Sequence, residues 1–175
     1  MLFRSLHIQI TNEDLPFGFR WLNRNAAMYC HGRIDFKKES GESMFVTDMP
    51  LRWSGTPEPT PMQVKIGSQV GEIVDHFRYY LEQKVNIPAG QSRKLDLAAQ
   101  FDNEQECYGW SNESYFSSPK WRNPARKLDT DTYRVQISLF HLGGTYSFSC
   151  DLVRQSGKIE LRGRLKSKFK LTEQA

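Results

Sequence analysis

The chain of 175 residues is long enough for one domain with a substantial core, and its formal net charge is +4. Residues 160–171 hold five cations and one glutamate, and therefore carry a charge of +4 by themselves. The rest of the chain sums to zero, which excludes a globally basic protein and confines any attraction to polyanions to this segment. No apolar run approaches the ~20 residues of a membrane span, and the start of the chain lacks a secretory-signal pattern, so we expect a cytoplasmic protein.

Alternating apolar and polar residues predict β-strands along most of the chain. The alternation begins with Leu6, Ile8 and Ile10. It continues in four further segments, some of them broken by turns: residues 26–36, 84–101, 132–153 and 158–165. Because turn-forming Gly, Pro and Asn residues separate these short strands, we predict an all-β sandwich or barrel with antiparallel strands.

Residues 68–84 depart from this alternation. Apolar residues recur there at helical spacing, namely at Val70, Ile73, Val74, Phe77 and Leu81. We therefore predict one amphipathic helix at about residues 71–83, inserted between strands. The proline-rich residues 54–61 before it should form a loop, because proline lacks the amide hydrogen that a strand donates. The predicted organisation is a β-sandwich domain at 1–165 and a basic C-terminal tail at 166–175.

Several short motifs occur in a fixed order along the chain: Ala26-x-x-x-Cys30, Leu51-x-Trp53, Ile87-Pro88-x-Gly90 before Leu95-Asp96-Leu97, and Tyr133-x-Val135-x-Ile137. In this order the chain resembles a family of poorly characterised prokaryotic immunoglobulin-like β-sandwich domains, from about Leu6 to Leu161. Such domains often occur as accessory modules, sometimes behind transmembrane helices. The resemblance implies an immunoglobulin-like sandwich that acts as a binding or sensing module. It also implies that the native protein can be tethered to a membrane. It transfers no catalytic residue, and fold analogy alone does not establish function.

Residues 107–124, with the sequence CYGWSNESYFSSPKWRNP, combine aromatic side chains with serine and asparagine. Loops of this composition often bind partners, because aromatic rings give a large contact area at a small entropic cost. The predicted partner surface consists of the aromatic residues of this loop and of the nearby LRWSGTPEP segment: Trp53, Tyr108, Trp110, Tyr115, Phe116 and Trp121. In the alternative interpretation, the rings of the loop cover an open end of the sandwich. For Trp53, packing into the core is the favoured interpretation. Asn112-Glu113-Ser114 is a glycosylation sequon that matters only in a secreted protein.

The basic segment near the C-terminus places a cation at every second position: Arg162, Arg164, Lys166, Lys168 and Lys170. We predict a strand through about Leu165, in which these charges share one face. A row of cations on an exposed strand deters pairing between sheets, and this edge protection is the favoured interpretation. The alternative is that the same side chains bind the phosphates of a nucleotide or nucleic acid.

No arrangement of residues in the sequence identifies a reaction. The histidines show no metal-ligand spacing, and neither a nucleophile elbow, a phosphate loop nor a zinc-protease motif is present. The three cysteines are far apart, which favours reduced, buried thiols over a disulfide framework; the alternative is a single bridge, for instance from Cys30 to Cys150. We expect no cofactor, no metal and no enzymatic activity. The favoured prediction is a non-catalytic interaction or sensing module with a protein partner, and the alternative is nucleotide or nucleic-acid binding.

Overall fold

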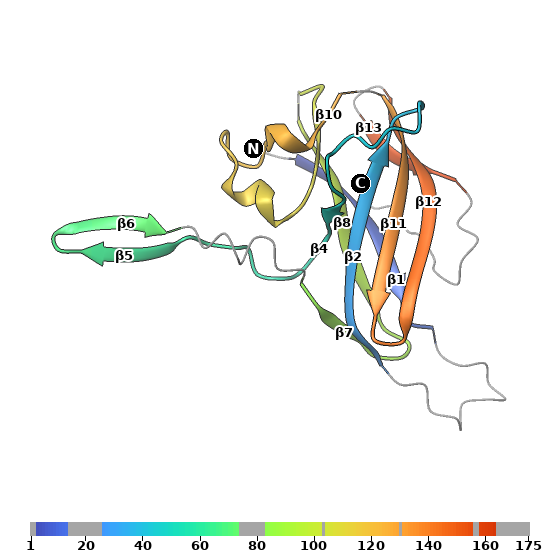
Figure 1. Cartoon of the computed structure of the whole chain (residues 1–175), viewed down its shortest axis with the longest axis horizontal. Coiled ribbons are helices and arrows are strands. Elements are labelled where there is room, and N and C mark those ends of the chain that lie inside the picture. The colour runs from blue at the N-terminus through green and yellow to red at the C-terminus, as the bar shows by residue number, and fades with distance from the viewer. Residues whose placement is uncertain are drawn as a thin grey trace.

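The computed structural model describes residues 3–13, 26–73, 83–102, 104–129, 131–155 and 158–163. Its strands form antiparallel sheets, which confirms the all-β prediction, and two of these sheets pack together as the body of the molecule (Figure 1). Apolar residues from both sheets meet in one core, including Ile8 and Leu95 from one sheet and Ile34 and Val135 from the other. The body is therefore a sandwich-like arrangement built on the alternation seen in the sequence.

The first sheet has five strands. Four of them follow the order β1-β8-β9-β10, and β4 pairs with β8 beside this path. Their bounds are β1 Phe3–Thr11, β4 Arg52–Trp53, β8 Ser92–Phe101, β9 Cys107–Gly109 and β10 Lys127–Leu128. A register shift between Leu6 and His7 marks an irregularity in the pairing of β1 with β8. Two short 3₁₀ helices lie between β9 and β10, η2 at Asn112–Phe116 and η3 at Pro124–Arg126.

The second sheet has six strands. Five follow the order β13-β12-β11-β2-β3, and β7 pairs with β2 beside this path. Their bounds are β2 Ala27–Lys37, β3 Met49–Pro50, β7 Val85–Ile87, β11 Thr132–His141, β12 Gly144–Gln155 and β13 Lys158–Arg162. The burial of β2 and β11 alternates strictly along much of each strand, so one face of this sheet lies on the core and the other faces solvent.

The three cysteines are free and buried, as the sequence predicted. Burial raises the pKa of the Cys107 thiol to about 12 and that of the Cys150 thiol to about 11. Burial also raises the pKa of Cys30. The neutral thiols therefore behave as small apolar side chains of the core.

A third, two-stranded sheet stands away from the body (Figure 1). It is the hairpin of β5, Met62–Ile66, and β6, Gln69–Ile73, which we call the arm. Ile66 pairs with Gln69 across a two-residue turn, in which Gly67 has a φ of 64° that favours glycine. The structure corrects the start of the predicted helix at 71–83: residues 71–73 belong to β6, and residues 74–82 lie outside the described residues.

The basic segment begins on an edge strand, because β13 is the last strand of its sheet. β13 ends at Arg162, short of the predicted end near Leu165, and residues 164–175 lie outside the described residues. Across the ranges that the structure describes, no helix is both long and apolar enough to span a membrane.

Candidate functional site

Most of the predicted aromatic partner surface is packed against the outer face of the five-stranded sheet. Neighbouring residues of a strand point to opposite faces, so Ala98 joins the main core while Ala99 and Phe101 point outward. There they form a second cluster with Tyr108 and Trp110. Tyr115 and Trp121 pack against this cluster from the segment that holds η2 and η3. The 107–124 segment therefore covers one face of the sheet.

The exposure of the six predicted partner-binding side chains favours the packing interpretation. Trp53 and Trp110 are 2% exposed and Tyr108 is 4% exposed, which leaves a partner almost no surface to touch. Trp53 lies in the main core, where its Nε1 donates to the carbonyls of Cys30 and Gln83 at 3.2 and 3.0 Å. The other three, Tyr115, Phe116 and Trp121, are partly buried. A binding role for the whole set would require the second cluster to open.

The glycosylation sequon is folded into the same segment. The Asn112 side chain is 7% exposed, and its Oδ1 accepts a hydrogen bond from Arg52 Nη1 at 2.8 Å. Ser111 caps η2, with its hydroxyl accepting from the Glu113 amide. In the folded protein, the acceptor amide of the sequon is thus inaccessible to a glycosylating enzyme.

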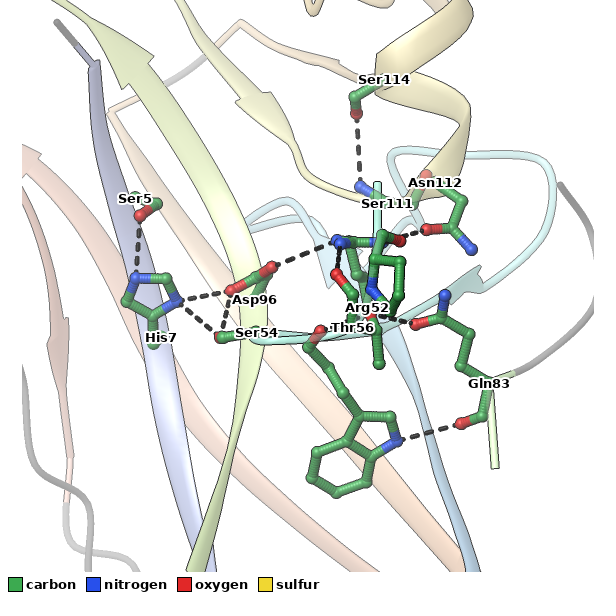
Figure 2. Close-up of polar contacts among 12 residues, drawn as sticks. Ser5, His7, Arg52, Ser54, Thr56, Gln83, Asp96, Ser111, Asn112 and Ser114 are labelled. Atoms are coloured by element: carbon green, nitrogen blue, oxygen red, sulfur yellow. Dashed lines mark hydrogen bonds and ion pairs between the residues drawn. The ribbon is translucent and has the colours of Figure 1, made fainter. Parts of the chain in front are cut away.

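A row of polar side chains, largely buried, crosses the outer face of the five-stranded sheet (Figure 2). Asp96 on β8 lies directly opposite His7 on β1 and Arg52 on β4. His7 Nδ1 lies 2.6 Å from Asp96 Oδ1, and Arg52 Nε lies 3.9 Å from Asp96 Oδ2. Arg52 and Asp96 are only 4% and 5% exposed, so the two buried charges compensate each other. The Ser54 hydroxyl donates a further hydrogen bond to Asp96.

The remaining donors of Arg52 hold the chain that leads into the arm. Arg52 Nη2 donates to the carbonyl of Thr56, and Nη1 donates to that of Pro57 at 3.2 Å. The returning chain is held beside it, because the Thr56 hydroxyl lies 2.7 Å from Gln83 Oε1. Trp53 binds the backbone carbonyl of Gln83. Thr56 and Pro57, which precede the arm in the chain, and Gln83, which follows it, are therefore held on the five-stranded sheet, and we call this set of contacts the anchor (Figure 2).

Ser5, His7 and Asp96 make contacts in the order found in the catalytic triads of serine hydrolases. Ser5 Oγ lies 2.8 Å from His7 Nε2, and His7 Nδ1 contacts Asp96. Acyl transfer also needs donors arranged for the developing oxyanion, beside a place for the substrate. Ser5 and His7 are joined here to Asp96, which already compensates the buried charge of Arg52. We therefore assign these side chains to the anchor.

A hollow of about 290 Å³ lies on the outer face of the six-stranded sheet. It is lined by Ile34 and by five polar residues, Arg33, Asp35, Asp48, Gln136 and Ser138. Arg33 Nη1 bonds Asp48 at 2.7 Å, and Asp35 accepts from the Ser43 hydroxyl. The charges of the hollow are thus largely satisfied within the chain. Among the described residues, no three His, Cys, Asp or Glu side chains are grouped to hold a metal ion.

The arm has the opposite character to the anchor. All of its residues are exposed except Val64, which is partly buried. The pairing of Met62 with Ile73 and of Val64 with Gly71 places Met62, Val64, Ile66 and Ile73 on one face. Met62, Ile66 and Ile73 are 46%, 71% and 47% exposed. In the part of the chain that the structure describes, neither strand of the arm has a second partner strand.

Only one of the predicted phosphate-binding cations falls within the described residues. Arg162 lies on β13, where Nε donates to Glu160 Oε1 at 2.7 Å and Nη2 to Gln155 Oε1 at 3.2 Å. The charge of Arg162 is thus compensated locally by Glu160. Arg164, Lys166, Lys168 and Lys170 lie outside the described residues.

Sequence reasoning placed the site in the aromatic loop and missed the arm. The missed signal was the alternation of Met62, Val64 and Ile66 followed by Gly67-Ser68, a pattern typical of a tight hairpin. Comparison of the chain with protein-family models, curated proteins and solved structures finds no match. The functional argument therefore depends on the geometry of the arm and its anchor.

Proposed function

We propose that the chain is a cytoplasmic protein-interaction module, in which an immunoglobulin-like sandwich presents the arm to a partner protein. The observation that carries this proposal is the apolar face of a hairpin that stands clear of both sheets of the body. Two further features support the immunoglobulin-like fold and the cytoplasmic location. Two packed antiparallel sheets around the buried Trp53 agree with the immunoglobulin-like resemblance. Three free, buried thiols agree with a reducing compartment.

An isolated two-stranded hairpin is at best marginally stable in water, and three strands or a packed apolar face are needed for stability. A partner that covers the arm supplies what is missing. Burying the exposed parts of Met62, Ile66 and Ile73 contributes roughly 2–5 kcal/mol, since full burial of such a side chain contributes about 1.5–3 kcal/mol. This gain is partly offset by the entropy of association.

The free strand edges and the charges of the arm indicate which kind of partner surface it can bind. Neither strand pairs with a further strand among the described residues, so both offer edges that suit the addition of a strand from another protein. The charges of Lys65 and Glu72 cancel, so a strongly charged partner surface would gain no attraction. The partner should therefore present a free strand edge beside apolar side chains. The anchor helps, because it holds Thr56, Pro57 and Gln83 on the sheet before binding and so reduces the entropic cost of association.

Site-specific photo-crosslinking tests the proposal. A photoreactive amino acid is placed at Ile66 on the arm or, as a control, at Val46, a fully exposed residue of the body. A protein crosslinked only from position 66 is identified by mass spectrometry, purified, and titrated against the unlabelled chain. Ile66→Asp and Ile73→Asp should each weaken this binding at least tenfold, whereas Val46→Asp should leave it unchanged. Equal crosslinking from both positions, or binding that survives the arm substitutions, contradicts the proposal.

A further inference from the structure

The pattern of apolar and polar side chains in β5 is the same when read from either end of the strand. Met62, Val64 and Ile66 are apolar, and Gln63 and Lys65 alternate with them as uncharged and positively charged polar residues. The strand is centred on Val64, with two residues on each side. A strand with this symmetry can pair with an antiparallel copy of itself without placing an apolar side chain opposite a polar one.

Resting on the proposed function, we infer that the partner of the arm is a second copy of this chain, paired antiparallel through β5 about a twofold axis at Val64. Val64 then lies opposite Val64 of the second copy, and Met62 lies opposite Ile66. On the other face, Gln63 lies opposite Lys65, so no like charges meet. The two arms form one sheet in the order β6-β5-β5-β6, with an apolar face continuous across both copies.

β6 does not offer the same match. Antiparallel pairing about its central residue, Gly71, would place Gln69 opposite Ile73 and Val70 opposite Glu72. Each of these pairs joins an apolar to a polar side chain, and glycine in a strand interior gives no side chain to pack. Pairing of β5 with β6 of another copy is heterologous and leaves further edges open to additional copies, whereas the β5 pairing closes at two.

The exposed edge of β5 agrees with this assignment. Strands at the edges of sheets are commonly protected by charges, prolines or bulges, and β5 carries a single charge, on Lys65, within regular pairing to β6. Joining two arms also reaches the number of strands that an independent sheet needs. The contact is small compared with the interface of an obligate dimer, so we expect a reversible dimer of micromolar affinity.

Position 64 gives a direct test, because in this register it faces only itself. Val64→Lys places two ammonium groups opposite each other, and Val64→Glu places two carboxylates there. Sedimentation equilibrium should show that the wild type dimerises and that each variant alone has a dissociation constant raised at least tenfold. An equimolar mixture of the two variants should recover dimers, since lysine then faces glutamate. Recovery in the mixture shows that neither variant has merely unfolded. Val70→Glu, on the opposite face of the same arm and opposite Lys65, is the matched control and should dimerise as the wild type does.

Each other outcome overturns the inference. A monomeric wild type up to about 1 mM, the concentration at which even a weak complex forms, means that a second copy is not the partner. The proposed function still stands if that monomer is crosslinked from Ile66 to a different protein, and it falls with the inference if it is not. A monomer whose melting temperature drops in Val64→Lys means that residues of the same chain cover the arm. A dimer that is insensitive to position 64, or is not recovered in the mixture, uses another surface or register.

Discussion

The anchor and the arm lie close together in the sequence, yet the anchor buries charged side chains whereas the arm exposes apolar ones. The anchor buries a charged pair, with Arg52 at 4% and Asp96 at 5% exposure. The arm exposes its apolar residues, with Ile66 at 71% and Val70 at 66%. The buried guanidinium of Arg52 holds the backbone carbonyls of Thr56 and Pro57, which precede the arm, so its role is positional. Exposed apolar residues on a fixed support are the more informative sign of a binding surface.

The largest effect should come from breaking the buried pair of the anchor. Asp96→Ala leaves the Arg52 guanidinium buried without its carboxylate, and we expect a loss of about 3–5 kcal/mol in the free energy of unfolding. Urea denaturation measures it. The control is Asp48→Ala at the ion pair with Arg33, where both side chains are well exposed (38% and 42%), and the loss should stay below about 1 kcal/mol. Similar small losses in both variants would mean that Arg52 is effectively solvated.

The second cluster should respond almost as strongly. Trp110→Ala removes a side chain that is 2% exposed, and we expect a loss of about 3 kcal/mol, at the low end for such a truncation because the cluster is small. Thermal unfolding followed by circular dichroism measures it. Trp121→Ala, at the partly buried edge of the cluster, should cost less. An unchanged melting temperature in Trp110→Ala would restore the aromatic loop as a candidate binding surface.

The buried thiols should make the body sensitive to alkaline pH. The pKa values of Cys107 and Cys150 are raised by burial to about 12 and about 11, above the unfolded value of 9.0. The folded chain then binds more protons, so this contribution is complete below about pH 9 and is lost as the pH rises toward 11–12. At pH 10 the loss should be about 1 kcal/mol per thiol. Denaturant titrations at pH 8 and 10 measure it, and replacing both cysteines by Ala or Val should reduce the pH dependence; an unaltered pH dependence would assign the effect to other groups.

The smallest effect on stability should come from the arm itself. Ile66→Ser changes a side chain that is 71% exposed on a hairpin outside both sheets of the body. At a concentration where the protein is monomeric, we expect the free energy of unfolding to change by less than about 0.5 kcal/mol. Val46→Ser, at an exposed site of the body, is the matched control. A loss above 2 kcal/mol in Ile66→Ser alone would mean that the arm packs against its own chain.

The sequence predicted the body well because the period-two pattern of its strands is a local property. The burial of Ile34, Val135 and Leu95 can be predicted from the polar residues that alternate with them in the sequence. The arm was misassigned in part because Val70 and Ile73 are three residues apart, which fits a helix, whereas in the structure they lie on opposite faces of β6. The anchor could not be predicted, since Arg52 and Asp96 meet only through the pairing of β4 with β8. The burial of Trp110 likewise depends on which segment covers the outer face of β8.

The buried Asn112 has a consequence for making the protein in a eukaryotic secretory system. There, glycans are attached to sequons as the chain emerges, before it folds. A glycan on Asn112 would occupy a side chain that is 7% exposed and that accepts a hydrogen bond from Arg52. We expect the glycosylated chain to be retained or misfolded, so that only unmodified protein is secreted. Intact-mass spectrometry of secreted and retained fractions measures this distribution, and a secreted, folded chain with a glycan at Asn112 would contradict it. Ser114→Ala removes the sequon while preserving Asn112, which makes it the practical variant for such a host.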